Sequence, residues 1–242
     1  MKARAIFYTC TCLIMFASLV PAQSAGDEKT DAYYIGFLRR GPRWTPGNTP
    51  ETQRVQAAHM AHIGEMAGSG KLVGAGPFSD GGQLRGVFVF KVGSMEEAKA
   101  LAEADPAVKA GRLSVDLYAW TGPEGVGAKY AAERKANPRA KDEMVTYQMA
   151  LLARGPKWAP EATGDAKRMT REREAFLGRL KASGKLAAAG PFTDAGELRE
   201  MLVLQVALPE EAKALMENDP LVKAGILSLE VHPWWVAKGT LP

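Results

Sequence analysis

The sequence predicts an α+β protein that consists of two tandem ferredoxin-like βαββαβ units packed sheet to sheet. First, the 242-residue chain is duplicated: residues 33–120 align without a gap with residues 147–234, and 41 of the 88 positions are identical. Second, each copy alternates strand-like and helix-like hydrophobic patterns in the order βαββαβ. Third, such a unit carries its helices on one face of its sheet, so the other apolar face must be covered by a second sheet.

The repeat divides the chain into four segments. Residues 1–25 are expected to be a signal peptide, residues 32–121 and 145–236 the two domains, and residues 122–144 a linker. Each copy is roughly 90 residues long, within the usual size of a domain. The linker is rich in glycine and charged residues, and its stretch 129–135 favours a helix.

The first half of a copy is predicted to contain one strand and one long helix. Residues 34–38 are rich in β-forming side chains, which indicates a strand. Residues 50–68 place apolar and histidine side chains three and four positions apart, as on one face of an amphipathic helix. The residues on that face are Val55, His59, His62, Ile63 and Met66.

The second half of a copy is predicted to contain a hairpin, a capped helix and a last strand. The expected segments are strands at 72–75, 86–92 and 113–120, a turn at 80–82, and a helix that begins at Met95. Ser94 is placed to cap that helix. Asp105 and Pro106 end it, and together with Gly111 they fit a one-turn helix that begins at the proline and ends at the glycine.

Composition and charge exclude several classes of function. The chain is 46% hydrophobic and 24% charged, which is ordinary for a folded protein, and its formal charge of +4 comes from basic residues interleaved with acidic ones. Nucleic-acid binding would need a stripe of one sign, so no nucleic-acid partner is predicted. The motifs of nucleotide-binding loops and serine hydrolases are missing from the sequence.

The N-terminal segment resembles an export signal. Lys2 and Arg4 precede an apolar run at 5–20, and small residues follow it up to Ala25. The run is shorter than the about 20 residues that span a bilayer, so a permanent anchor is the weaker alternative. We expect a periplasmic or secreted protein with no stable membrane insertion after cleavage. Both cysteines, at positions 10 and 12, lie in this segment, so no disulfide framework is expected downstream.

Two of the three histidines are candidates for chemistry. His59 and His62 are three residues apart on the inward face of the first long helix, so their rings can reach the same space. Such a pair could hold a metal, but a site needs a third ligand, and the alternative is packing between helix and sheet. The second copy has Arg173 and Phe176 at these positions, so the fold does not need the imidazoles. No metal and no cofactor is predicted.

Two carboxylates of the first copy could serve a histidine as partner. They are Asp80 and Asp105, which recur as Asp194 and Asp219. An aspartate fixes the tautomer of a neighbouring histidine, as a general base near neutral pH requires. Both also suit structural roles, because Asp105 can cap a helix and Asp80 can bond its own turn. The sequence leaves open which of the two lies nearer His59.

The loop at 40–44, RGPRW, also has two interpretations. Arg40 could contact an anion, or the loop could be a simple turn whose Trp44 covers one end of the barrel.

Taken together, these segments resemble the YCII-related (YciI-like) family of the dimeric α+β barrel superfamily. The likeness rests on His59, GKL at 70–72, AGP at 75–77, SMEEA at 94–98 and ADP at 104–106. The resemblance implies an intramolecular dimeric α+β barrel and a site in which His59 pairs with Asp105. Some members look like enzymes acting on lactones or chlorinated hydroquinones, and many have no known activity. Because Arg173 replaces the histidine, the resemblance implies that the second copy is silent in acid–base chemistry.

These inferences give one leading hypothesis and two alternatives. The leading one is an exported, cofactor-independent lyase or isomerase that uses His59 and Asp105 on a small organic substrate. The candidate substrate-binding residues are Arg40, His62, Asp80, Arg173 and Asp219. The first alternative is a non-catalytic small-ligand-binding module of the cell envelope, with the positive charge supplied by Arg173. The second is an assembly role at the envelope, and further association into a homo-oligomer is compatible with all three.

Overall fold

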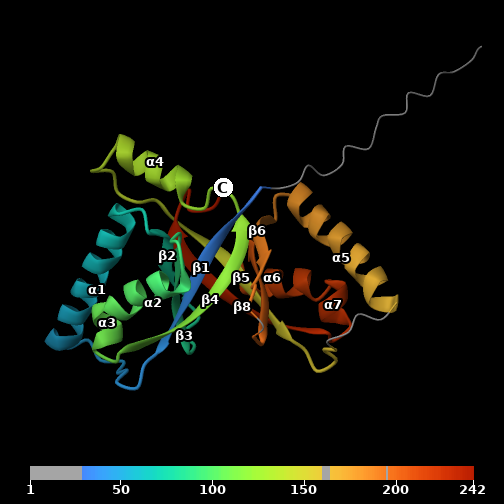
Figure 1. Ribbon diagram of the computed structural model, residues 1–242, viewed down its shortest axis with the longest axis horizontal. Helices are drawn as coiled ribbons and strands as arrows, with labels where there is room; N and C mark the ends of the chain where they lie inside the picture. Colours follow the sequence, from blue (N-terminus) through green and yellow to red (C-terminus); the bar gives the residue numbers. More distant parts are fainter. Residues whose placement is uncertain (1–28, 160–163, 195) are drawn as a thin grey trace, which may run out of the picture.

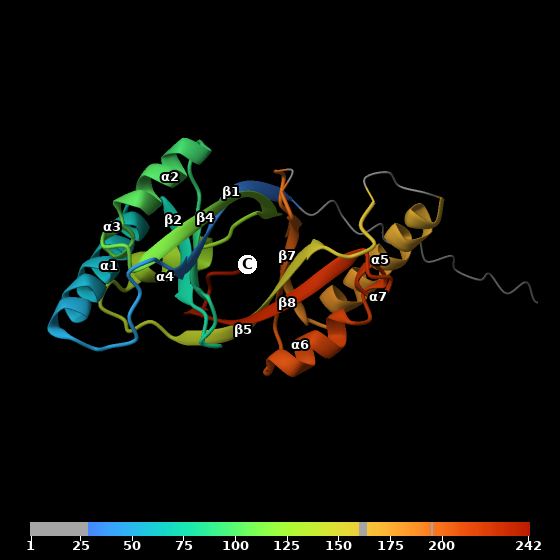
Figure 2. The same ribbon diagram turned by 90° about the horizontal axis from the view of Figure 1, so that it is seen from below.

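The protein is described by a computed structural model that covers residues 29–159, 164–194 and 196–242. The expected signal peptide lies outside these residues. Two four-stranded antiparallel sheets occupy the centre of the molecule, and helices cover the outer side of each (Figures 1 and 2). Within the described ranges, none of the helices combines the length and the hydrophobicity of a membrane-spanning segment.

The first copy has the predicted element order. Its elements are β1 (Thr30–Arg40), α1 (Pro50–Gly68), β2 (Leu72–Pro77), β3 (Leu84–Phe90), α2 (Met95–Ala104), α3 (Pro106–Lys109) and β4 (Leu113–Pro123). The strands are arranged in the order β2-β3-β1-β4. The predicted strand at 34–38 is too short, because β1 pairs with β4 along its whole length, from Thr30 opposite Pro123 to Arg40 opposite Leu113.

The second copy repeats this arrangement. Its elements are β5 (Met144–Arg154), α5 (Gly164–Ala182), β6 (Leu186–Pro191), β7 (Leu198–Leu204), α6 (Pro209–Met216), α7 (Pro220–Lys223) and β8 (Leu227–Ala237). Its strand order, β6-β7-β5-β8, is the same. The tandem βαββαβ prediction is therefore confirmed. Between the copies lies α4 (Ala128–Ala136), which matches the helical tendency predicted near the start of the linker.

Local sequence signals explain where the helices of the first copy begin. Thr49 caps α1, since its hydroxyl accepts from the backbone N–H of Thr52 while the Thr52 hydroxyl accepts from the N–H of Thr49. Ser94 caps α2 by accepting from the backbone N–H of Glu97 at 3.1 Å, as predicted. On the predicted inward face of α1, His59 and Met66 are buried.

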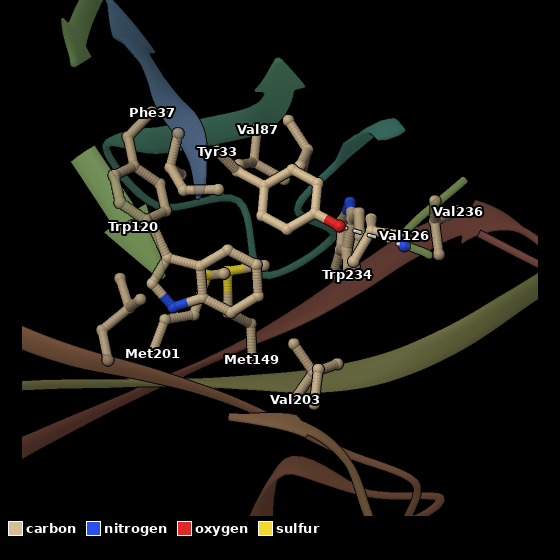
Figure 3. Close-up of a cluster of buried hydrophobic side chains, with 14 of the residues drawn as sticks. Tyr33, Phe37, Val87, Trp120, Val126, Met149, Met201, Val203, Trp234 and Val236 are labelled. Atoms are coloured by element: carbon tan, nitrogen blue, oxygen red, sulfur yellow. Dashed lines mark hydrogen bonds between the residues drawn. The ribbon is translucent and has the colours of Figure 1, made fainter. Parts of the chain in front are cut away.

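The inner faces of the two sheets enclose the central core. Aromatic rings from the first copy meet methionine and valine side chains from the second, and all are almost fully buried (Figure 3). The largest members are Tyr33, Phe37, Phe78, Trp120, Phe192 and Trp234. Two further clusters lie between each sheet and its own helices. Each sheet is thus apolar on both faces, as the sheet-to-sheet prediction requires.

The two sheets join at their edges to close a barrel. Phe78, just after β2, forms a bridge with Trp234 of β8, and Trp120 of β4 forms the equivalent bridge with Phe192, just after β6. The indole Nε1 of Trp120 also donates to the carbonyl of Gly190 at 2.8 Å. The dimeric α+β barrel is therefore formed within one chain.

Two equivalent glycines allow the edges to come this close. A Cβ atom at Gly76 would overlap the carbonyl oxygen of Trp235, and one at Gly190 would overlap the carbonyl oxygen of Thr121. In both cases the obstacle is backbone from the other copy, which a rotamer change does not remove. The AGP segment of each copy therefore serves barrel closure.

We expect Gly76→Ala or Gly190→Ala to lower the free energy of unfolding by about 1–3 kcal/mol, because the strand edges must separate. Gly64→Ala is the matched control: the position lies in α1 and a Cβ there meets nothing within 4 Å. That control should stabilise the protein by about 0.5–1 kcal/mol, since alanine is the better helix former. Urea unfolding measures all three. Equal effects of Gly76→Ala and Gly64→Ala would contradict this account of closure.

Candidate functional site

His59 and Asp105 form a buried pair in the first copy. His59 projects from the middle of α1, and Asp105 lies at the junction of α2 and α3. The Nδ1 atom of His59 lies 2.7 Å from Oδ2 of Asp105, and the aspartate is fully buried. The other carboxylate oxygen, Oδ1, accepts from the backbone N–H groups of Ala107 at 2.8 Å and Val108 at 3.3 Å. Asp105 is therefore both a helix cap and the partner of His59, and each role uses a different oxygen.

This arrangement determines which ring nitrogen of His59 is available. A carboxylate facing Nδ1 favours the tautomer with the proton on Nδ1, which leaves the lone pair on Nε2. Within the described part of the chain, Nε2 has no hydrogen-bond partner. The ring is also stacked on Phe88, with 6.0 Å between centroids. His59 is thus held in one orientation with one basic nitrogen free.

A cavity of about 460 Å³ lies beside His59, between α1 and the first sheet. Its volume is within the range of roughly 300–1,000 Å³ that is usual for small-molecule sites. Most of its walls are apolar side chains, contributed by α1, β2 and β3. The second copy adds Met144 and Trp235, so the cavity is completed only where the two copies meet.

The polar part of the cavity wall is positive. The charged lining residues are Arg85 and Arg112, and the lining contains no carboxylate. Both guanidinium groups lie over the ring of Trp44, at 5.0 Å and 5.3 Å from its centroid. Neither arginine carries a local signal in the sequence, because the two come together only through the folding of the loop that carries Trp44.

The equivalent place in the second copy is occupied by ion pairs. The Nε atom of Arg173 lies 2.7 Å from Oδ2 of Asp219, and its Nη2 atom lies 2.7 Å from Oε2 of Glu200. Burial lowers the pKa of the Arg173 guanidinium, but the charges of Glu200 and Asp219 raise it by more, so the arginine stays charged. Because its charge is balanced within the protein, this arrangement does not favour Arg173 as the ligand for an external anion.

A second substitution accompanies the change from histidine to arginine. Glu200 occupies the position of Gly86, which lines the cavity of the first copy. An acidic side chain in place of glycine on a buried strand needs a cation nearby, and Arg173 supplies it. Comparing the two copies position by position could have revealed this compensating exchange.

The remaining predicted site residues lie away from the cavity. Arg40 donates to the carbonyl of Gly81 at 2.7 Å and stacks on Trp44 without lining the cavity. The Nε2 atom of His62 lies 3.0 Å from the carbonyl oxygen of Leu101, and this contact links α1 to α2. Among the described residues, no three His, Cys, Asp or Glu side chains are grouped as they would be to hold a metal ion.

Asp80 pairs with the third histidine rather than with His59. Its Oδ2 atom lies 2.6 Å from Nδ1 of His232, which belongs to β8 of the other copy. Its Oδ1 atom accepts from the backbone N–H of Gly82 at 3.2 Å, as the turn predicts. Burial raises the pKa of Asp80, but the hydrogen bond and charge of His232 and the backbone N–H of Gly82 together outweigh it, so the pKa is lowered. This pair links the two copies, a role that the sequence did not suggest for His232.

The fold and the site define a class: a tandem α+β barrel with a buried histidine–aspartate pair beside a cavity in one of its two copies. The sequence was also matched by a protein-family model: that of the YCII-related domain covers residues 42–121 and 146–235. The chain therefore belongs to the YCII-related family, in two tandem copies. No curated protein matches it in sequence.

Solved structures share the fold at low sequence identity. A chlorite dismutase variant from Candidatus Nitrospira defluvii, determined in complex with cyanide, is 9% identical, with a TM-score of 0.56 over 88% of this chain and 93% of that chain. A second variant of that enzyme is 10% identical, with the same TM-score and coverage. At this identity the likeness shows a common fold and carries no statement about activity.

We expect Arg173→Ala to lower the free energy of unfolding by about 3–5 kcal/mol, because it leaves Glu200 and Asp219 buried without their cation. Arg171→Ala, an exposed arginine of the same helix, should change it by less than about 0.5 kcal/mol. Chemical denaturation of both variants tests the difference. A loss as small for Arg173→Ala as for Arg171→Ala would show that the ion pairs do not hold the second copy together.

The lowered pKa of Asp80 predicts a pH-dependent link between the copies. Its contribution is fully present above the unfolded pKa of about 3.9 and is lost as the pH falls through the lower folded value. Asp80→Asn should therefore cost about 1 kcal/mol or less at pH 7, and the cost should shrink at about pH 3. A double-mutant cycle with His232→Gln, measured at both pH values, should show a coupling that weakens in acid. A coupling independent of pH would contradict this interpretation.

Proposed function

We propose that the first copy is the working site and that His59, oriented by Asp105, moves a proton on a small organic molecule held in the cavity. The protein would then be an exported, cofactor-independent lyase or isomerase. The observation that carries this proposal is the difference between the copies. The first keeps a histidine with a free Nε2 next to a cavity, whereas the second fills the equivalent place with ion pairs.

The geometry suits general acid–base chemistry. Nε2 of His59 would take a proton from a C–H or O–H bond of the substrate, and the resulting imidazolium would face the carboxylate of Asp105 at 2.7 Å. The same nitrogen would return the proton to a second atom of the substrate, which completes an isomerisation. In an elimination the proton would go to the leaving group instead. The apolar walls would keep water away from the intermediate.

A non-catalytic binding module is the second candidate. It is favoured by the second copy, which has exchanged the histidine for a structural ion pair while keeping the fold. In this case the cavity would hold its ligand without changing it. Export to the periplasm or beyond, which the N-terminal sequence predicts, is part of either proposal.

Proton abstraction can be tested without knowing the product. The protein is incubated in D2O with a panel of lactones, keto acids and dicarbonyl compounds, and loss of C–H signals is followed by proton NMR. His59→Gln should lower the rate of exchange at least about 100-fold. Asp105→Asn should also lower it, although asparagine can still cap α3. His62→Gln, on the same helix but outside the cavity, should leave the rate unchanged.

The outcomes separate the two candidates. Exchange that persists in His59→Gln would exclude His59 as the base. Saturable binding of a panel member without exchange or turnover in the wild-type protein would favour the binding module.

A further inference from the structure

The cavity of the first copy and the surface next to it around Trp44 carry positive charge that the protein does not neutralise. Three guanidinium groups, those of Arg40, Arg85 and Arg112, surround the ring of Trp44 at 5.0–5.5 Å from its centroid. None of the three forms an ion pair with a carboxylate in the described ranges. Stacking on an indole is worth only about 0.5–1 kcal/mol for each cation, so it does not cancel their mutual repulsion.

Neutral groups hold two of these arginines in place. Arg112 donates to the hydroxyl and the carbonyl of Thr45 at 2.8 Å and 3.0 Å, and Arg40 donates to the carbonyl of Gly81 at 2.7 Å. The side chain of Arg85 contacts Trp44 but makes no hydrogen bond to any described residue. The cluster is therefore fixed in position while its charge, and the donors of Arg85, remain available.

The second copy serves as an internal comparison, and there fewer cations lie without an ion pair. Arg199, the counterpart of Arg85, lies over Trp158 at 5.2 Å and donates to two backbone carbonyls, at 3.4 Å each. The counterpart of Arg112 is Ile226, and Arg154 is paired with Glu197. Among the described residues, the second copy thus has one arginine without an ion pair at this place, whereas the first copy has three and also keeps the His59–Asp105 pair.

From this we infer that the ligand of the first copy is an organic carboxylate, with its carboxylate group at Arg85 and Arg112 and its apolar body against α1 near His59. This inference rests on the proposed function and specifies its substrate class. A planar carboxylate matches the two parallel donors of a guanidinium group, and both arginines line the same cavity as His59. The apolar walls favour a carboxylate attached to a small ring or branched chain over a phosphate or a free inorganic anion.

Benzoate and benzamide are suitable probes, because they have nearly the same shape and differ in charge. Their binding is followed by the NMR signals of the histidine Cε1–H groups, of which the chain has three, at 59, 62 and 232. Benzoate should shift the His59 signal saturably, and benzamide should bind at least about tenfold more weakly. Arg85→Gln and Arg112→Ile should each weaken benzoate binding by about tenfold or more. Arg199→Gln is the matched control and should have no effect.

Several results would overturn the inference. These are equal binding of benzamide and benzoate, benzoate binding unchanged by both arginine substitutions, benzoate binding that leaves the His59 signal unmoved, and no saturable binding of benzoate. None of these results affects the expected proton exchange with the uncharged lactones and dicarbonyl compounds, so the proposed function would still stand. Conversely, if carboxylates bind as expected but exchange persists in His59→Gln, the proposed function fails and the ligand class stands.

Discussion

Neither sheet of this protein could remain exposed on its inner face, and the mutual burial of these two faces is the constraint on which the rest depends. The core that they enclose contains large aromatic side chains from both copies (Figure 3). Burying such faces requires the strand edges to meet, which the structure achieves where Gly76 and Gly190 allow backbone to approach backbone. The position of the candidate site follows, because Met144 and Trp235 reach the first cavity only when the barrel is closed.

Few substitutions distinguish the site beside the cavity in the first copy from the ion-paired place that corresponds to it in the second. The same helix, the same one-turn helix and the same capping aspartate are present in both, and the decisive differences are at two positions. A histidine beside a glycine leaves space and a free nitrogen, whereas Arg173 beside Glu200 makes a buried ion pair. Burying those charges is costly unless they meet, so the two changes are useful only together.

Much of the fold could be predicted from the sequence because the repeat reports each pattern twice. The strand and helix periods, Ser94 as a cap and Asp105 as the start of a short helix are local signals that the structure reproduces. Long-range partners were harder to predict. The choice between Asp80 and Asp105 as partner of His59 depended on how hairpins and helix ends come together across the sheet. Arg85, Arg112 and His232 have no local signature, because their neighbours belong to distant loops or to the other copy.

Joining the copies in one chain also changes what evolution can do with the barrel. When two identical subunits form such a barrel, symmetry places every residue at both equivalent positions, and a substitution that disables one site disables its twin. Here α4 and its flanking segments connect two separately encoded halves. One half can accumulate substitutions that stabilise the barrel while the other keeps its reactive groups. Within a single polypeptide, one copy can therefore contribute stability and the other the chemistry.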